Sequence, residues 1–307
     1  MNLLVTGASG LIGTALVERA GRGGHSVTRL VRSAPGSSSG TTEVHWSPGQ
    51  GQIDVTGLER AGPFDGVVNL AGAGIGDRRW SPARKALLLE SRADSTRLLV
   101  DTLLRLSVRP PVLVSASAVG FYGDRGDEEL TETSASGQGF LAEVCRAWEA
   151  AARPAAGGGI RTVLLRTGIV LSGHGGALGK QLPLFRVGLG GRMGTGDQYR
   201  SWITLEDEIG AILHCLTDDG LSGPVNATAP APAPDAELAR AIGAVLHRPT
   251  AMAVPATALR LALGSERAEE LVLGGQRVLP GALESTGYPF AHPALDGAVR
   301  SVLAGDR

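Results

Sequence analysis

The sequence predicts an α/β protein built on a Rossmann-like, doubly wound parallel sheet, with a smaller C-terminal region. Short apolar runs at residues 3–6, 27–31 and 64–70 are typical of buried parallel strands. A helical pattern at residues 11–20 lies between the first two strands and is followed by Gly23. Because parallel strands require a crossover, this alternation places helices on both faces of one sheet.

The alternation of strands and helices continues to about residue 170, where the composition of the chain changes. Residues 172–200 are rich in glycine and carry few regular patterns, and residues 33–40 are typical of a Ser/Gly/Pro loop. We therefore divide the chain into a first domain, residues 1–171, and a C-terminal region, residues 172–307, interleaved with it. The other predicted elements are strands at 44–46, 112–115 and 161–166 and helices at 81–105, 140–153, 236–246 and 256–263.

The bulk composition argues against several classes of protein. The 307 residues include 29 basic and 30 acidic ones, so charge does not support a nucleic-acid partner or an anionic membrane surface. No uncharged run reaches the ~20 residues of a membrane span, and no His/Cys/Asp/Glu cluster has metal-ligand spacing. Cys145 and Cys215 stand far apart, which predicts reduced thiols in a cytoplasmic protein.

Three glycines separate the first predicted strand from the first predicted helix at a spacing of three and three. Gly7 allows the tight turn off the strand, Gly10 lets the backbone approach a pyrophosphate, and Gly13 lets the helix pack closely on the sheet. The helix begins at Leu11 and Ile12, where free N–H groups and the helix dipole favour phosphate. This motif, in the context of a strand and a helix, predicts a dinucleotide site.

The end of the second predicted strand indicates which dinucleotide is bound. A site for NAD needs an acidic side chain there to accept from the ribose 2′-hydroxyl, but residues 26–42 contain no Asp or Glu. Arg32 and Ser33 stand there instead, and a guanidinium suits a 2′-phosphate. The sequence therefore predicts NADP(H) as cofactor, with a solvated loop arginine as the alternative interpretation of Arg32.

Further segments combine with the glycine motif into a more specific pattern. They are residues 69–72 (NLAG), 79–80, 91–92, 115–123 (SASAVGFYG), 145–149, 165–171 (LRTGIVL), 183–191 and 273–280. The combination resembles the extended short-chain dehydrogenase/reductase superfamily. More closely, it resembles the atypical branch described as epimerase family proteins of the NAD-dependent epimerase/dehydratase type, with a C-terminal region of unknown function. The resemblance covers essentially the whole chain.

The resemblance implies an NADP(H)-binding first domain and a substrate region formed largely after residue 172. By position, Leu70 and Ala71 would line the adenosine and pyrophosphate, and Gly168 and Ile169 would lie near the nicotinamide. Arg92 would reach the phosphates or the adenosine end; a salt bridge on the helix surface is the alternative. The complete predicted cofactor set is Gly7, Gly10, Leu11, Ile12, Gly13, Arg32, Ser33, Leu70, Ala71, Arg92, Ser115, Gly168 and Ile169.

The catalytic pattern of the superfamily is incomplete in this chain. Active members use a serine, a tyrosine and a lysine, and the lysine lowers the pKa of the tyrosine from about 10 toward neutrality. Ser117 fits the serine position, with Ser115 as the other candidate. Leu141 and Cys145 stand at the tyrosine and lysine positions. Tyr122 is the nearby phenol, so the candidate catalytic residues are Ser117 and Tyr122.

The sequence therefore leaves several functions open. One is an oxidoreductase or epimerase that acts on an unknown small molecule with an acid other than the tyrosine of the superfamily. The others are a non-catalytic NADP(H)-binding sensor or regulatory module and a lapsed enzyme. We expect a monomer or homodimer. Arg200 is a candidate ligand for a substrate phosphate, whereas Lys180, Arg186 and Arg192 are expected to be solvated loop charges.

Overall fold

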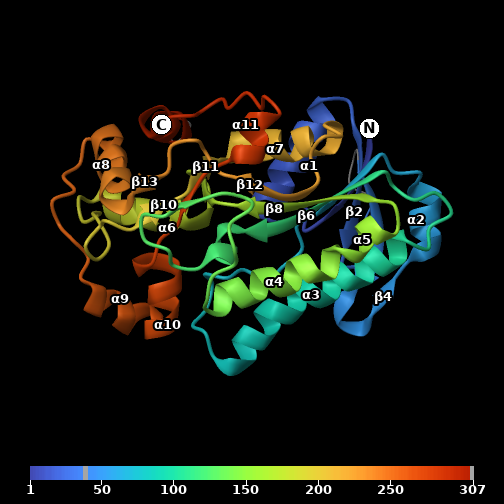
Figure 1. The fold of residues 1–307 in the computed structure, drawn as a ribbon, viewed down its shortest axis with the longest axis horizontal. Helices are drawn as coiled ribbons and strands as arrows, with labels where there is room; N and C mark the ends of the chain where they lie inside the picture. The colour runs from blue at the N-terminus through green and yellow to red at the C-terminus, as the bar shows by residue number, and fades with distance from the viewer. Residues whose placement is uncertain (37–40, 305–307) are drawn as a thin grey trace.

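One large sheet organises the fold of the chain, for which the computed structural model describes residues 1–36 and 41–304 (Figure 1). Of the loop predicted at 33–40, residues 37–40 therefore lie outside the described residues. The strand order is β12-β8-β6-β5-β1-β2-β3-β4, and all neighbours are parallel except β3 and β4. The strands are β1 (Asn2–Thr6), β2 (Ser26–Val31), β3 (Thr42–Ser47), β4 (Gln52–Ile53), β5 (Gly66–Asn69), β6 (Val112–Ala118), β8 (Arg161–Thr167) and β12 (Gly223–Ala227).

The sheet is doubly wound about β1, which confirms the predicted fold class. From β1 the chain crosses through α1 (Leu11–Arg22) to β2 and β3, whereas β5, β6, β8 and β12 lie on the other side of β1. In such sheets, ligands bind outside the carboxyl ends of the strands, at the point where the winding reverses. Thr6 ends β1 and Asn69 ends β5, so the residues that follow these two strands border that crevice.

The strands form because their side chains alternate between two apolar layers. Leu3 and Val5 of β1 are buried in the core on one face of the sheet, and Leu4 is buried in the core on the other. Val114 and Leu113 of β6 divide in the same way. A strand that is buried on both faces has a continuous apolar sequence, which explains why these runs are recognisable without a polar alternation.

Helices cover both faces of the sheet, and local signals set where two of the long ones, α3 and α7, begin. The Ser81 hydroxyl accepts from the Arg84 N–H at the start of α3, where Pro82 occupies the first turn. Thr204 caps α7 by accepting from the Asp207 N–H. One face carries α1, α7 (Leu205–Thr217) and α11 (Gly281–Ser285); the other carries α2 (Val55–Ala61), α3 (Pro82–Leu103), α4 (Phe140–Ala152), α5 (Pro154–Gly157) and the short η1 (Pro48–Gln50) (Figure 1).

Part of the C-terminal region lies at one end of the molecule, on the left in Figure 1, whereas its α7 and α11 cover the main sheet. The helices at that end are α6 (Gly176–Arg186), α8 (Asp235–Leu246), α9 (Ala256–Leu263) and α10 (Ser265–Ala268). The C-terminal region is not a separate unit, because β12 adds to the main sheet beside β8. Two small two-stranded sheets join it to the first part of the chain: β11 (Trp202–Thr204) pairs with β9 (Ile169–Leu171), and β14 (Arg277–Val278) pairs with β7 (Glu129–Leu130). A third small sheet, β10 (Tyr199–Arg200) with β13 (Ala233–Pro234), lies within the region. Its further helices are the π-helical η3 (Glu269–Leu273) and α12 (Leu295–Ala304).

The expectation that residues 172–200 lack regular structure is wrong for their middle part, which forms α6. The glycines around it and the internal Pro183 obscure the helical signal. Leu178, Leu182 and Phe185 nevertheless follow the i, i+4, i+7 spacing of a helix, and all three are buried in the core around α8. Tertiary packing of this apolar stripe thus outweighs the weak local preference.

Two glycines of α1 give opposite expectations for replacement by alanine. A Cβ at Gly13 would lie 2.2 Å from the Gly7 carbonyl oxygen, whereas a Cβ at Gly21 would have no neighbour within 4 Å. Gly13→Ala should therefore lower the free energy of unfolding by about 1–3 kcal/mol. Gly21→Ala should raise it by up to about 1 kcal/mol, because alanine is the better helix former. Urea denaturation measures both; equal stability of the two variants would contradict the close packing of α1 on the turn.

Candidate functional site

The turn between β1 and α1 has the geometry of a phosphate cradle. Gly7 adopts a left-handed φ of +67°, and a Cβ there would lie 2.5 Å from the Leu70 carbonyl oxygen. The N–H of Gly10 donates to the Gly7 carbonyl at 3.0 Å. A Cβ on Gly10 would approach only the Gly7 oxygen, at 3.4 Å, so the space before the helix is open. No side chain caps α1 at Gly10, and the first N–H groups, from Leu11 onward, face this space.

The region after β2 carries positive charge and offers no free carboxylate. Arg32 and Ser33 are both exposed immediately after the strand ends at Val31. The nearest acid in sequence, Glu43 of β3, forms an ion pair with Arg29 and accepts from the Gly36 N–H at 2.7 Å. The Gly36 N–H also holds the pKa of Glu43 below its ordinary value. The carboxylate is therefore already used within the protein.

A buried hydrogen-bond network fixes the carboxyl ends of β1, β5 and β6 relative to one another. The Thr6 hydroxyl donates to Asn69 Oδ1 at 2.8 Å. Asn69 Nδ2 in turn donates to the hydroxyls of Thr96 at 2.8 Å and Ser115 at 3.1 Å. Trp148 of α4 joins the network through its indole N–H, which donates to Thr96. Ser115, predicted as a cofactor contact, is fully buried here and holds the strand ends together.

Leu70 and Ala71 lie against the glycine turn, as their predicted role requires. Both of their N–H groups donate to the Thr6 hydroxyl, at 3.1 and 3.2 Å. The Leu70 carbonyl also makes the close approach to Gly7 described above. The segment after β5 and the turn after β1 therefore form two adjoining walls of the crevice, on either side of the switch point.

Arg92 of α3 is a buried cation beside this segment. Its guanidinium lies 5.0 Å from the centroid of the Trp148 ring and donates to the Leu88 carbonyl at 3.0 Å. A Cβ on Gly72 would lie 3.0 Å from its Cζ. No carboxylate of the described residues pairs with it, and burial lowers its pKa to about 10. The predicted alternative, a salt bridge on the helix surface, does not occur among these residues.

Gly168 and Ile169 follow β8 and contact the C-terminal region. The Ile169 N–H donates to the Ser201 carbonyl at 2.7 Å, and a Cβ on Gly168 would lie 2.6 Å from the same oxygen. Further along, a Cβ on Gly175 would lie 3.5 Å from the Leu11 side chain at the start of α1. The segment from β8 to α6 thus borders the crevice opposite the segment after β5.

Ser117 and Tyr122, the two candidate catalytic residues, are buried in a second polar network. Ser117 Oγ donates to Glu149 Oε1 at 2.9 Å, and Arg166 Nε donates to the same oxygen at 2.8 Å. The Tyr122 hydroxyl accepts from Arg166 at 3.0 Å and donates to Asn226 Oδ1 at 2.7 Å. Burial raises the pKa of Tyr122, the reverse of what an acid–base tyrosine needs. Both hydroxyls are therefore used inside the protein.

The first two turns of α4 carry the residues that replace the expected tyrosine and lysine. A Cβ on Gly120, in η2 (Val119–Tyr122), would lie 3.2 Å from the Leu141 Cβ. Cys145 Sγ lies 3.6 Å from the Ala118 carbonyl, and burial raises the pKa of its thiol to about 11. An aliphatic group and a neutral thiol thus face the end of β6, and neither can act as an acid–base pair near pH 7.

Arg200 does not serve as the substrate ligand that its position suggested. It is buried, and its Nε donates to Asp235 Oδ1 at 2.9 Å. Two more of its donors, on Nη1 and Nη2, reach the carbonyls of Gly274 and Val272. The second oxygen of Asp235 accepts from the Met193 N–H at 2.7 Å. Arg200 therefore ties β10 to the chain before β14, with three of its five N–H donors bonded inside the protein and its guanidinium buried.

Glu208 is a buried acid that the sequence interpretation did not single out. It lies on α7, fully buried, and its Oε1 accepts from the Thr167 hydroxyl at 2.8 Å. Its Oε2 has no hydrogen-bond partner among the described residues. Burial raises its pKa to about 8, so the carboxyl is mainly protonated at neutral pH. Glu208 cannot be recognised from the sequence, because it follows Glu206 and Asp207 at a helix start, where acids are common.

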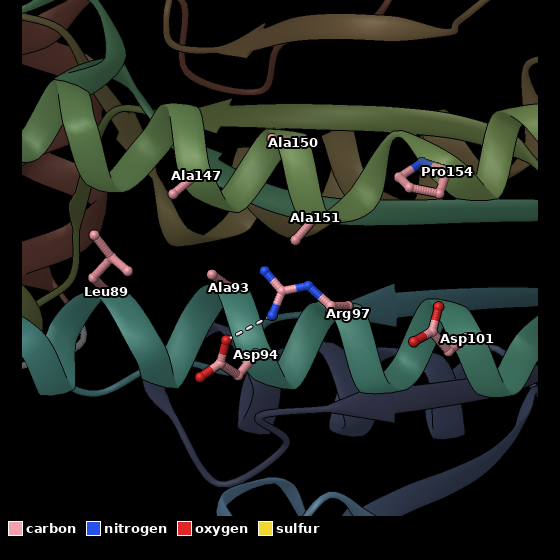
Figure 2. A pocket seen from close by; sticks show the side chains of 9 residues that line it. All are labelled: Leu89, Ala93, Asp94, Arg97, Asp101, Ala147, Ala150, Ala151 and Pro154. Carbon is pink, nitrogen blue, oxygen red and sulfur yellow. Dashed lines mark hydrogen bonds and ion pairs between the residues drawn. The ribbon is translucent and has the colours of Figure 1, made fainter.

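A cavity of about 450 Å³ lies between α3 and α4 and not at the strand ends (Figure 2). Four alanines form much of its wall, and Arg97 and Asp94 form an ion pair at 2.7 Å along its side. It holds none of the predicted site residues. Its lining is Leu89, Ala93, Asp94, Arg97, Asp101, Ala147, Ala150, Ala151 and Pro154.

Among residues 1–36 and 41–304, no helix is long and apolar enough to cross a membrane. The same residues contain no group of three or more His, Cys, Asp or Glu side chains arranged to hold a metal ion.

Comparison with known proteins places the chain in a family. The model of the NAD dependent epimerase/dehydratase family matches residues 3–227, and a domain of unknown function (DUF1731) matches residues 254–302. The first match covers most of the chain. The chain therefore belongs to the NAD dependent epimerase/dehydratase family, as the sequence motifs predicted.

Individual relatives and solved structures support this family membership. An epimerase family protein of Mycobacterium bovis is 45% identical over 295 residues, covering 96% of this chain and 95% of the relative. The crystal structure of human epimerase family protein SDR39U1 (isoform 2) with NADPH is 34% identical, with a TM-score of 0.88 and 99% of each chain covered. A nucleoside-diphosphate sugar epimerase structure from Corynebacterium glutamicum is 36% identical, with a TM-score of 0.78, and covers 99% of this chain but 58% of that one.

The buried acid Glu208 predicts a pH-dependent stability. In the unfolded chain its carboxyl ionises near pH 4.5, whereas in the folded protein it ionises near pH 8. Between these values the unfolded state binds fewer protons, so stability falls as pH rises, by up to about 1.4 kcal/mol per pH unit. Glu208→Gln removes this term and keeps a partner for Thr167. Urea unfolding from pH 5 to 8 should show wild type losing stability relative to this variant, while the exposed Glu237→Gln variant should follow wild type. A parallel course of wild type and Glu208→Gln would refute the assignment.

Proposed function

We propose that this chain binds NADP(H) at the switch point of its sheet and uses it in an oxidoreductase or epimerase reaction on a small molecule. The observation that carries the proposal is the open glycine cradle before α1, with Arg32 exposed at the end of the next strand. The human relative crystallised with NADPH supports it, because it shares the fold over 99% of both chains.

Each wall of the crevice has residues suited to one part of this cofactor. The N–H groups at Leu11 and Ile12 would hold the pyrophosphate, and Gly10 would let the backbone approach it closely. Arg32 and Ser33 would hold the 2′-phosphate, since a guanidinium pairs well with phosphate oxygens. The backbone of Leu70 and Ala71 would lie along the adenosine side, and Gly168 and Ile169 along the nicotinamide side. NADPH supplies a hydride to a substrate, and NADP⁺ removes one.

Arg92 is the cation that we assign to the position left by the missing lysine. Its guanidinium lies beside Gly72 at the edge of the crevice, and its charge acts on the Cys145 thiol, at the lysine position. A buried guanidinium without a carboxylate partner is costly unless an anion or a polar ligand group reaches it. Contact with the cofactor's phosphates or ribose would meet that need.

The acid–base step is not assigned to Ser117 or Tyr122, because their hydroxyls are bonded to Glu149 and Asn226 in the interior. We propose instead that these two residues hold the end of β6 and η2 in place. The proton then passes between the substrate and water in the crevice, without a side chain of the Tyr-Lys type.

A second function is favoured by a specific observation. Neither Leu141 nor Cys145 supplies a group that ionises near pH 7 on the nicotinamide side. A protein that binds NADP(H) without turnover needs no such group. Such a protein would act as a sensor or a partner-regulated module. We place either function in the cytoplasm, because Cys145 and Cys215 are both free thiols.

Replacing Arg32 tests the cofactor proposal. Arg32→Asp should weaken NADPH binding by roughly 10- to 100-fold and leave NADH binding nearly unchanged, because only NADPH carries the 2′-phosphate. Isothermal titration calorimetry with each dinucleotide measures the effect. Arg19→Asp, an exposed site on α1, is the matched control and should retain the wild-type preference. Failure of wild type to bind NADPH would reject the proposed function.

Turnover distinguishes the two candidate functions. Purified protein should oxidise NADPH in the presence of at least one member of a panel of aldehydes and ketones, followed at 340 nm. The Ser117→Ala variant should keep most of that rate, because its hydroxyl bonds to Glu149 and not to the substrate. Tight NADPH binding without oxidation across the panel would favour the sensor, and a large loss of rate in Ser117→Ala would return that hydroxyl to the reacting site.

A further inference from the structure

Three cations converge on the short loop that follows β5. The loop, residues 71–77, has the sequence Ala-Gly-Ala-Gly-Ile-Gly-Asp. Arg84 donates to the Gly74 carbonyl, and both Arg267 and Lys180 donate to the Gly76 carbonyl, at 2.6 and 3.3 Å. These cations come from α3, α6 and α10, which are far apart in sequence.

The charge of this cluster is not balanced. Asp77 is the one acidic residue of the loop, and it pairs with Lys180 at 3.0 Å. The hydrogen bond from Lys180, together with the charges of Arg84 and Arg267, holds the pKa of Asp77 below its ordinary value. The other partners of these cations are neutral carbonyls. Three positive charges therefore share one carboxylate, in a protein whose formal net charge is −1.

Two donors of the cluster have no partner. The Nε–H groups of Arg84 and Arg267 are buried, and neither makes a hydrogen bond with the part of the chain that the structure describes. Buried donors are normally satisfied, and leaving one unmade costs about 1–3 kcal/mol. In the same region Lys85 forms an ion pair with Glu266 at 2.7 Å, which connects α3 to α10 without using the unsatisfied donors.

The loop lies next to the position at which the reacting group of a substrate would stand. Ala73 and Ile75 pack in one apolar cluster with Leu141, which occupies the tyrosine position of the superfamily. The indole N–H of Trp80 donates to the Ile75 carbonyl at 3.1 Å and holds the loop there. An anionic group bound on the cations would thus be one loop away from the nicotinamide side of the crevice.

We propose that Arg84, Lys180 and Arg267 form a subsite for an anionic group of the substrate, a carboxylate or a phosphate. This inference rests on the proposed function, because it names the class of molecule that would meet the cofactor. The guanidinium groups offer directed N–H donors and Lys180 offers a mobile ammonium, the donor types that bind both anions. Asp77 competes with the ligand for the same cations.

The test uses protein saturated with NADPH and two probes, inorganic phosphate and malonate, at constant ionic strength set with sodium chloride. Calorimetric titration should show saturable binding of at least one probe, and the preferred probe tells phosphate from carboxylate. Lys180→Gln and Arg267→Gln should each weaken binding about tenfold, since each removes a charged hydrogen-bond donor. Arg97→Gln, an exposed site on α3, loses the same charge outside the cluster and should bind as wild type.

Asp77→Asn is the most discriminating variant, because removal of the competing carboxylate should tighten binding of the anionic probe several-fold. A purely structural role of the cluster would leave this affinity unchanged or lower it. The subsite is rejected if neither anion binds saturably, if Arg97→Gln weakens binding as much as Lys180→Gln does, or if Asp77→Asn fails to tighten it. NADPH affinity, measured in wild type and in the same variants, tests the proposed function separately. If wild type does not bind NADPH, the proposed function is rejected. If wild type binds NADPH but neither anion, only the subsite is rejected.

Discussion

The buried ion pair between Glu149 and Arg166 constrains the whole reaction side of the molecule. Both residues are almost fully buried, and their hydrogen bonds extend to Ser117 on β6 and Tyr122 in η2. Arg166 also lies 3.5 Å from the centroid of the Phe121 ring. Breaking such a pair by removing one partner costs about 3–5 kcal/mol, because a buried charge is left alone. The hydroxyls of β6 and η2 are thereby committed to the interior.

This constraint separates the two halves of the crevice. On the cofactor side, the glycine turn, the uncapped start of α1 and the exposed Arg32 are available, as the proposed NADP(H) site requires. On the reaction side, the tyrosine and lysine positions hold Leu141 and Cys145, and the available polar groups face inward. Binding and chemistry are thus supported unequally within one fold, and membership of the family does not by itself define a reaction.

The C-terminal region contains one helix that sequence periodicity predicts and one that it does not. Helix α8 was predicted at 236–246 because its periodicity is regular, and the structure begins it at Asp235. Helix α6 was missed because glycines and Pro183 mask a stripe of buried residues that only packing against α8 stabilises. Lys180, expected to be a solvated charge, contacts Gly76 and Asp77 from this missed helix. Because α6 was not predicted, the place of Lys180 in the cluster with Arg84 and Arg267 could not be predicted either.

The parallel sheet, the glycine turn and the lack of an acid near Arg32 could be predicted from the sequence, because each depends on residues close together in the chain. A strand, a turn and a helix N-terminus are local features. Which polar side chains are bonded in the interior depends on the tertiary structure. Ser117 and Arg200 have the right types and positions in sequence, yet Glu149 and Asp235, distant along the chain, bind them in the interior. Burial and pairing between distant segments set the chemistry of a side chain, and a linear pattern does not contain that information.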